Sequence, residues 1–177
     1  MKPMPPIPGE HPLLTEARNC CRDAPEHSLA LSNQFLEIHP DDPDGLESRH
    51  NAWLELGRPD LALNDVNAAL AVRANSGSYF TRALVYRALG DHEHAIDDLT
   101  RSHQLDDGVM GFMPLLFRAD SLSQLGRLDE AMADCAHIPE DYWAPRYLGL
   151  PGGNKAFVVQ KIRKKALGAR NSNRKKS

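Results

Sequence analysis

The sequence predicts an all-α fold, a solenoid of stacked helical hairpins with a capping helix at its C-terminal end. Three observations lead to this prediction. Apolar residues recur at helical spacing, as at Tyr79, Ala83 and Tyr86. Three segments of the chain repeat one glycine-centred pattern, at intervals typical of a helical hairpin. No run of about 18 apolar residues is present, so a membrane-spanning helix is not expected.

The repeated segments are LGRPDLALNDV (56–66), LGDHEHAIDDL (89–99) and LGRLDEAMADC (125–135). An arginine stands eight residues before each glycine, an alanine five after it and an aspartate eight after it. The glycine suits the left-handed residue that ends a helix, and the alanine lets two helix axes approach closely. Each unit is therefore a hairpin of about 34 residues that cannot bury its own faces and must stack on its neighbours.

This pattern resembles the tetratricopeptide repeat, whose signature is W-x2-L-G-x2-Y, then A-x3-F, then P. Tyr79 fills the first aromatic column, and Trp53 and Tyr86 fill the second. Ala62, Ala95 and Ala131 match the alanine, whereas Val66, Leu99 and Cys135 replace the phenylalanine and the closing proline is missing. The resemblance, to small bacterial-type proteins of this family with no known partner, covers residues 43–138. It implies a right-handed α-solenoid.

The chain divides into segments at these repeats. We expect a flexible proline-rich N-terminus (1–10), a degenerate repeat (11–42), three clear repeats (43–75, 76–111 and 112–138, the last with a short second helix), an irregular segment plus capping helix (139–168) and a disordered basic tail (169–177). Asn154 is a good N-cap for a helix from about Lys155 to Leu167. Phe157, Val158, Ile162 and Leu167 are expected to cover the last hairpin, and Tyr142, Trp143, Tyr147 and Leu148 to pack into the same end.

The stretch DHEHAIDD (91–98) concentrates histidines and carboxylates, yet alignment with the other repeats places it at a turn and the start of a second helix. His92 and His94 are two residues apart, so on a helix they diverge by about 200°. We interpret the stretch as a solvated helix start and expect no catalytic residue, no metal ligand and no cofactor. Three cysteines without paired spacing indicate reduced thiols in a cytoplasmic protein.

An arginine and an aspartate sixteen residues apart recur in each clear repeat. The pairs are Arg49 and Asp65, Arg82 and Asp98, and Arg118 and Asp134. Sixteen residues link facing sites on the two antiparallel helices of one hairpin. We expect each arginine to bond its own aspartate, or the equivalent carboxylate next door, and to fix the register of the helices.

The family resemblance implies a concave groove that is lined by the first helices of successive repeats and binds peptides. The corresponding positions here are Glu47, Asn51, Leu54, Phe80, Leu84, Arg87, Met113, Leu116 and Asp120. Their apolar members stand at positions that core packing should not need, and carboxylates flank them. The resemblance therefore implies a non-catalytic adaptor or scaffold, a monomer or weak dimer, that binds a basic or amphipathic peptide or protein segment.

The charge of the chain is strongly asymmetric. Residues 155–177 carry nine Lys or Arg and no Asp or Glu, whereas residues 1–154 carry 12 basic and 24 acidic residues. The basic end leaves one alternative open, association with nucleic acid or an anionic surface. A second alternative is a chaperone of a bacterial type III-like secretion system. Coverage of the groove by the chain's own terminal segment is also left open.

Overall fold

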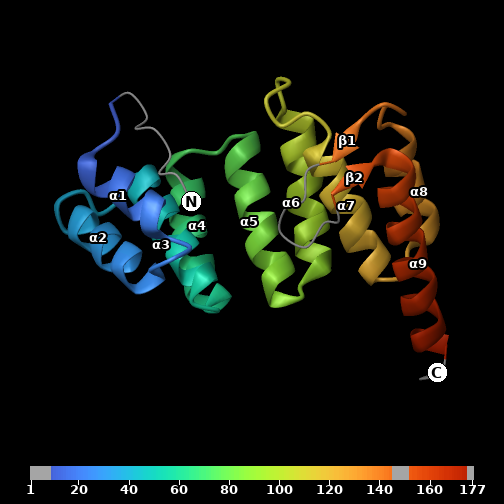
Figure 1. Cartoon of the computed structure of the whole chain (residues 1–177), viewed down its shortest axis with the longest axis horizontal. Coiled ribbons are helices and arrows are strands. Elements are labelled where there is room, and N and C mark those ends of the chain that lie inside the picture. Colours follow the sequence, from blue (N-terminus) through green and yellow to red (C-terminus); the bar gives the residue numbers. More distant parts are fainter. Residues whose placement is uncertain (1–8, 145–151, 175–177) are drawn as a thin grey trace. The chain divides into compact units, whose positions relative to one another are not determined.

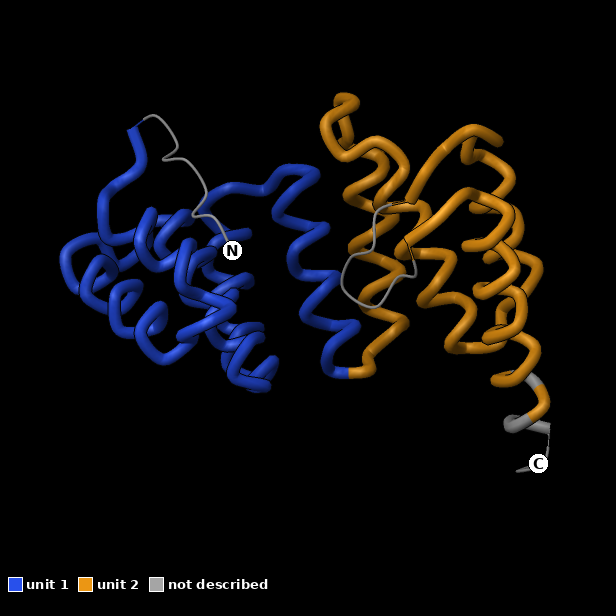
Figure 2. Tube along the Cα trace, in the orientation of Figure 1, with its two compact units in different colours: residues 1–89 blue, residues 90–177 orange. Residues whose placement is uncertain are grey.

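The computed structural model describes residues 9–144 and 152–174, which form helices packed in consecutive pairs (Figure 1). This arrangement confirms the predicted all-α hairpin fold. The chain divides into two compact units, Met1–Leu89 and Gly90–Ser177 (Figure 2). The division falls between the two helices of the predicted repeat 76–111.

The first unit contains α1 (Pro12–Cys20), α2 (Pro25–Ile38), α3 (Pro43–Glu55), α4 (Pro59–Val72) and α5 (Ser76–Leu89). Each of the first four begins with a proline, whose fixed φ and missing N–H suit the first turn of a helix. Consecutive helices pack on each other along the unit. Local chain chemistry therefore sets where these helices begin.

One core cluster of the first unit joins three helices. Leu14 of α1, Phe35 and Leu36 of α2 and Leu46 of α3 are all buried there. Gly45 lets α3 lie close to Phe35 of α2, because a Cβ atom at this position would lie only 2.7 Å from Phe35 Cδ1. A side chain at residue 45 would therefore force α2 and α3 apart.

The second unit contains α6 (His92–Leu105), α7 (Met113–Gln124), α8 (Leu128–Ala136), β1 (Trp143–Ala144), β2 (Gly153–Asn154) and α9 (Lys155–Arg174).

The repeated glycines take the predicted role, since Gly57, Gly90 and Gly126 have φ values of 69°, 78° and 77°. After Gly126, the Arg127 N–H donates to the Leu122 carbonyl over 3.0 Å and closes the helix. None of the described helices is both long and apolar enough to cross a membrane.

The C-terminal part differs from the prediction in two ways. A short antiparallel pair of strands, with Trp143 opposite Asn154, replaces part of the expected irregular segment. Helix α9 runs to Arg174, beyond the expected end near Leu167 and into the segment expected to be disordered. After Gly168, which stands within the helix, the segment contains no further glycine or proline that would end it.

The buried stripe of α9 is Val158, Ile162 and Ala166, at intervals of four residues. Phe157 and Leu167, which were expected to join it, are 42% and 45% exposed because they stand one position away from the stripe. Trp143, expected to pack into this end, is 70% exposed, whereas Tyr142 is half-buried. Tyr147 and Leu148 lie outside the described residues.

Candidate functional site

The structure brings together two of the predicted arginine–aspartate pairs. Between α3 and α4, Arg49 Nε and Nη2 donate to Asp65 Oδ2 and Oδ1 over 2.9 and 2.6 Å. Between α7 and α8, Arg118 Nε and Nη2 donate to Asp134 Oδ2 and Oδ1 over 2.8 and 2.5 Å. These hydrogen bonds raise the pKa of each arginine, although partial burial acts in the opposite direction. Both pairs thus join the two helices of one hairpin in a bidentate geometry.

The third pair is divided between the units, with Arg82 in the first and Asp98 in the second. Within its own unit, the Arg82 guanidinium lies 5.8 Å from the ring centres of both Tyr79 and Tyr86. Arg82 Nη1 also donates to Asn67 Oδ1 over 3.1 Å. The surroundings of Arg82 in the first unit therefore already hold its side chain against α4 and α5.

Each arginine also contacts the second helix of the preceding hairpin, a role that sequence reasoning missed. Arg49 donates to Asn33 over 3.3 Å, and Arg118 donates to Thr100 over 2.9 Å, as Arg82 does to Asn67. Asn67 and Thr100 stand five residues after the repeated alanines, and Asn33 stands five after buried Ser28 of α2. This shared polar column was a readable signal. The arginines therefore tie successive hairpins together as well as the helices of one hairpin.

In the first unit, the predicted groove residues are unequally exposed. Glu47 and Asn51 of α3 are exposed, and Leu54 of α3, Leu84 and Arg87 of α5 are half-buried. Arg73 Nη2 lies 2.8 Å from Asp44 Oδ1 and 3.8 Å from Glu47 Oε2. Phe80 of α5 is only 6% exposed, so the assignment of this residue to a solvent-facing strip requires correction. A large aromatic side chain that is buried to this extent stabilises the hydrophobic core and offers little surface to a ligand.

In the second unit, helix α9 occupies the face of α7 on which ligand contacts were expected. Met113 is half-buried, whereas Leu116 and Asp120 are each 2% exposed, so neither is available to a ligand. Lys165 Nζ of α9 forms an ion pair with Asp120 Oδ1. Helix α9 packs more extensively on α7 than on α8, whereas α3 of the first unit packs mainly on α4 and α2. The burial of Leu116 and the ion pair of Asp120 with α9 therefore correct the assignment of these two residues to an open groove.

The histidine-rich stretch at the start of α6 forms an ordinary helix cap. Asp91 Oδ1 accepts from the His94 N–H over 3.2 Å, and Asp91 Oδ2 lies 2.6 Å from His94 Nδ1. Although partial burial acts to raise the pKa of Asp91, these contacts with His94 lower it. In the part of the chain that the structure describes, no group of three or more His, Cys, Asp or Glu residues is placed to hold a metal ion.

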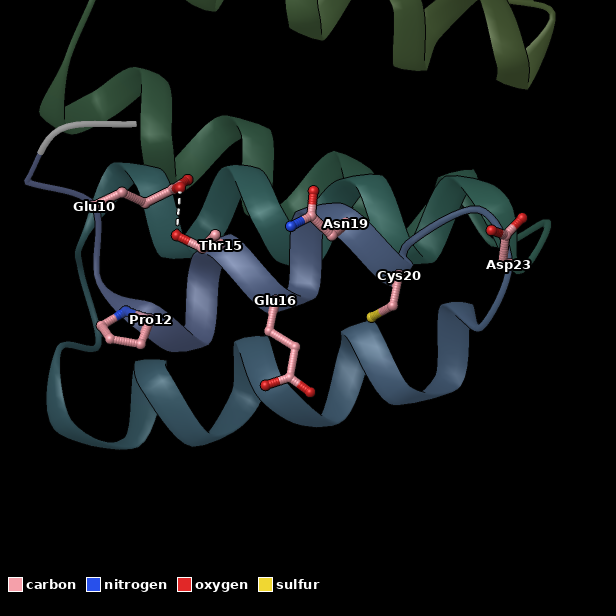
Figure 3. A pocket seen from close by; sticks show the side chains of 7 residues that line it. All are labelled: Glu10, Pro12, Thr15, Glu16, Asn19, Cys20 and Asp23. Carbon is pink, nitrogen blue, oxygen red and sulfur yellow. Dashed lines mark hydrogen bonds between the residues drawn. The ribbon is translucent and has the colours of Figure 1, made fainter. Parts of the chain in front are cut away.

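A shallow, open depression on and beside α1 was not expected from the sequence, which carries no motif there. Its lining residues are Glu10, Pro12, Thr15, Glu16, Asn19, Cys20 and Asp23 (Figure 3). Thr15 Oγ1 and Arg18 Nη2 each donate to Glu10 Oε2 over 2.7 Å. Burial raises the pKa of the Cys20 thiol, so the thiol is not activated as a nucleophile. The carboxylates of the depression favour a cationic group rather than a reaction.

Comparisons with known proteins agree with this helical architecture. A tetratricopeptide repeat family model matches residues 76–107. Outer dynein arm-docking complex subunit 4 from Xenopus laevis is 32% identical over 79 residues, which are 44% of this chain and only 15% of that protein. The chain therefore spans a small part of this curated relative's length.

Solved structures share the fold at low sequence identity. TTC0263, a thermophilic tetratricopeptide repeat protein of Thermus thermophilus, has a TM-score of 0.63 and 21% identity, covering 89% of this chain and 79% of its own. MamA has a TM-score of 0.61 and 16% identity over 92% and 79% of the two chains. YrrB, described as a tetratricopeptide repeat protein with an unusual peptide-binding site, has a TM-score of 0.60 and 19% identity over 89% and 81%. The chain thus has the fold of tetratricopeptide repeat proteins and carries a tetratricopeptide repeat at residues 76–107.

Proposed function

We propose that the chain is a non-catalytic interaction module that binds a basic or amphipathic peptide segment on the first helices of its first unit. Tetratricopeptide repeats are typically protein–protein interaction modules and generally lack catalysis. The binding site is assigned to the first unit because equivalent residues of α3 and α7 differ in exposure. Glu47 and Asn51 of α3 are exposed, whereas Leu116 and Asp120 of α7 are covered.

The charge of the available surface supports a basic ligand. Asp44 and Glu47 present carboxylates on α3, and Glu16 and Asp23 line the depression at α1. Arg73 Nη2 lies 2.8 Å from Asp44 Oδ1 and 3.8 Å from Glu47 Oε2, so these two carboxylates on α3 share one cation. Half-buried Leu54 of α3 adds apolar surface beside them. Apolar surface bordered by carboxylates suits a peptide with apolar and cationic side chains.

An array of synthetic peptides that vary in lysine and arginine content tests this proposal. The test variant is Glu47→Lys/Asn51→Lys, which reverses the charge of exposed α3 residues. The control is Glu37→Lys/Gln34→Lys, which makes the same change in net charge at exposed residues of α2, a second helix. We expect binding by the wild type and the control to rise with peptide charge, and binding by the test variant to be lost. Equal profiles for the two variants, or no dependence on peptide charge, would overturn the proposal.

A further inference from the structure

Helix α9 has a second face whose side chains are exposed in the part of the second unit that the structure describes. The buried stripe of Val158, Ile162 and Ala166 holds α9 against α7 and α8. The opposite side carries exposed residues at helical spacing, namely Phe157, Gln160, Lys161, Lys164 and Leu167. Arg163 is also exposed, at the edge of this outward face of α9. The outward face therefore combines cations with large apolar side chains.

The cations of the outward face form no ion pair with any residue that the structure describes. Lys155 pairs with Glu140, and Lys165 pairs with Asp120, so these two lysines help to attach α9 to the unit. Among the described residues, no carboxylate lies within ion-pair distance of Lys161, Arg163 or Lys164. Lys161 Nζ lies 5.2 Å from the centre of the Phe157 ring, and Arg163 Nη2 is 3.8 Å from Met132 Sδ. The outward face is thus a net positive surface, in a segment that has no acidic residue from 155 to 177.

Apolar side chains stand beside these charges. Trp143 is 70% exposed, and its strand partner is Asn154, the residue that immediately precedes α9. Asn154 Oδ1 accepts from the Phe157 N–H over 2.9 Å, which places Trp143 and Phe157 on neighbouring segments at the start of the helix. Leu167, six residues after Lys161, is 45% exposed. Exposure of a tryptophan, a phenylalanine and a leucine around lysines has no use in stabilising the unit.

We propose that the outward face of α9, together with Trp143, docks on the surface of an anionic phospholipid bilayer. Lysines beside such a surface gain electrostatic attraction, and tryptophan and phenylalanine are suited to the boundary between headgroups and acyl chains. An exposed aliphatic side chain such as Leu167 favours a bilayer over nucleic acid, because the acyl region accepts it and a phosphate backbone does not. The attachment is peripheral and goes beyond peptide binding by the first unit.

Co-sedimentation of the full chain with large unilamellar vesicles tests the proposal. The vesicles contain either phosphatidylcholine alone or a mixture with phosphatidylserine. We expect binding to the mixed vesicles only, and binding that weakens as the salt concentration rises. The variant Lys161→Gln/Lys164→Gln should bind about 25-fold more weakly, at about fivefold for each lysine near the surface. The control Arg22→Gln/Arg101→Gln removes the same charge from exposed sites outside α9 and should change binding less than twofold.

A second measurement tests the aromatic contact. In a Trp53→Phe background the emission reports Trp143 alone, because the chain has two tryptophans. Insertion at the bilayer boundary shifts this emission to the blue only when phosphatidylserine is present. Equal loss of binding in the lysine variant and the arginine control would overturn the proposal, as would binding to a DNA oligonucleotide without binding to vesicles. Neither result would affect peptide binding by Glu47 and Asn51 in the first unit.

Discussion

Buried His50 should make the stability of the first unit depend on pH between about 4 and 6.5. His50 occupies the column in which the other clear repeats carry Ala83 and Ala119, so an ionisable ring stands where the neighbouring repeats have a methyl group. His50 is 3% exposed, and its Nδ1 has no hydrogen-bond partner among the described residues. Burial lowers the pKa of His50 to about 4, more strongly than a contact with the Leu46 backbone raises it. The other histidines are exposed or half-buried.

The sign follows from which state binds the proton. The unfolded chain has a histidine pKa near 6.5, whereas the folded chain has a pKa of about 4, so the unfolded state binds more protons between these values. The free energy of unfolding therefore falls as the pH is lowered through 6.5, and the loss is complete below about pH 4. A difference of roughly 2.5 pKa units corresponds to about 3 kcal/mol, a large share of the stability of a domain of this size.

Urea unfolding at pH 7.5 and pH 4.5 measures this loss. Trp53 fluorescence in a Trp143→Phe background reports on the first unit, which contains Trp53. The variant His50→Ala removes the buried ring and should lose less stability on acidification than the parent, by most of the roughly 3 kcal/mol assigned to His50. The control His39→Ala, at an exposed histidine of the same unit, should retain the parent's dependence on pH. The same loss in parent and His50→Ala would show that His50 is not a buried neutral group and refute the reasoning.

Two further substitutions test the packing and the polar contacts of the first unit. Arg49→Ala leaves the Asp65 carboxylate, 5% exposed, without its bidentate partner. It should lower the free energy of unfolding by about 2 kcal/mol, less than for a fully buried pair, because Arg49 itself is partly solvated. In urea unfolding, Arg49→Met/Asp65→Leu should recover most of this loss, and an undiminished loss would show that the unpaired carboxylate is not its cause. Gly45→Ala places a Cβ atom 2.7 Å from Phe35 Cδ1 and should cost about 1–3 kcal/mol. Thermal denaturation measures this loss, with Gly77→Ala in α5 as the control, because the nearest atom to a Cβ at Gly77 is 3.4 Å away. An equal fall in melting temperature for both variants would contradict close packing at Gly45.

Several features could be predicted because they depend on residues that are near each other in the chain. Gly57 and Gly126 end helices through local left-handed geometry, and prolines begin α1 to α4 through their own fixed φ. The pairing of Arg49 with Asp65 follows from a spacing of sixteen residues across one turn. The contact of Arg49 with Asn33 also follows a regular column of the sequence, but this column was missed because the contact joins two hairpins instead of the two helices of one hairpin.

By itself, the sequence determined the hairpin repeat, the turns and the arginine–aspartate pairing, since each arises within about one repeat. Tertiary structure decided which surfaces remain available. Leu116 and Asp120 stand at ligand-facing positions of the repeat pattern, but α9 places Lys165 against Asp120 across 45 residues of sequence. Likewise, Val158 is buried and its neighbour Phe157 exposed because docking on α7 and α8 sets the rotation of α9 about its axis. Periodicity shows that a helix has an apolar face, but packing between distant segments selects the side that is buried.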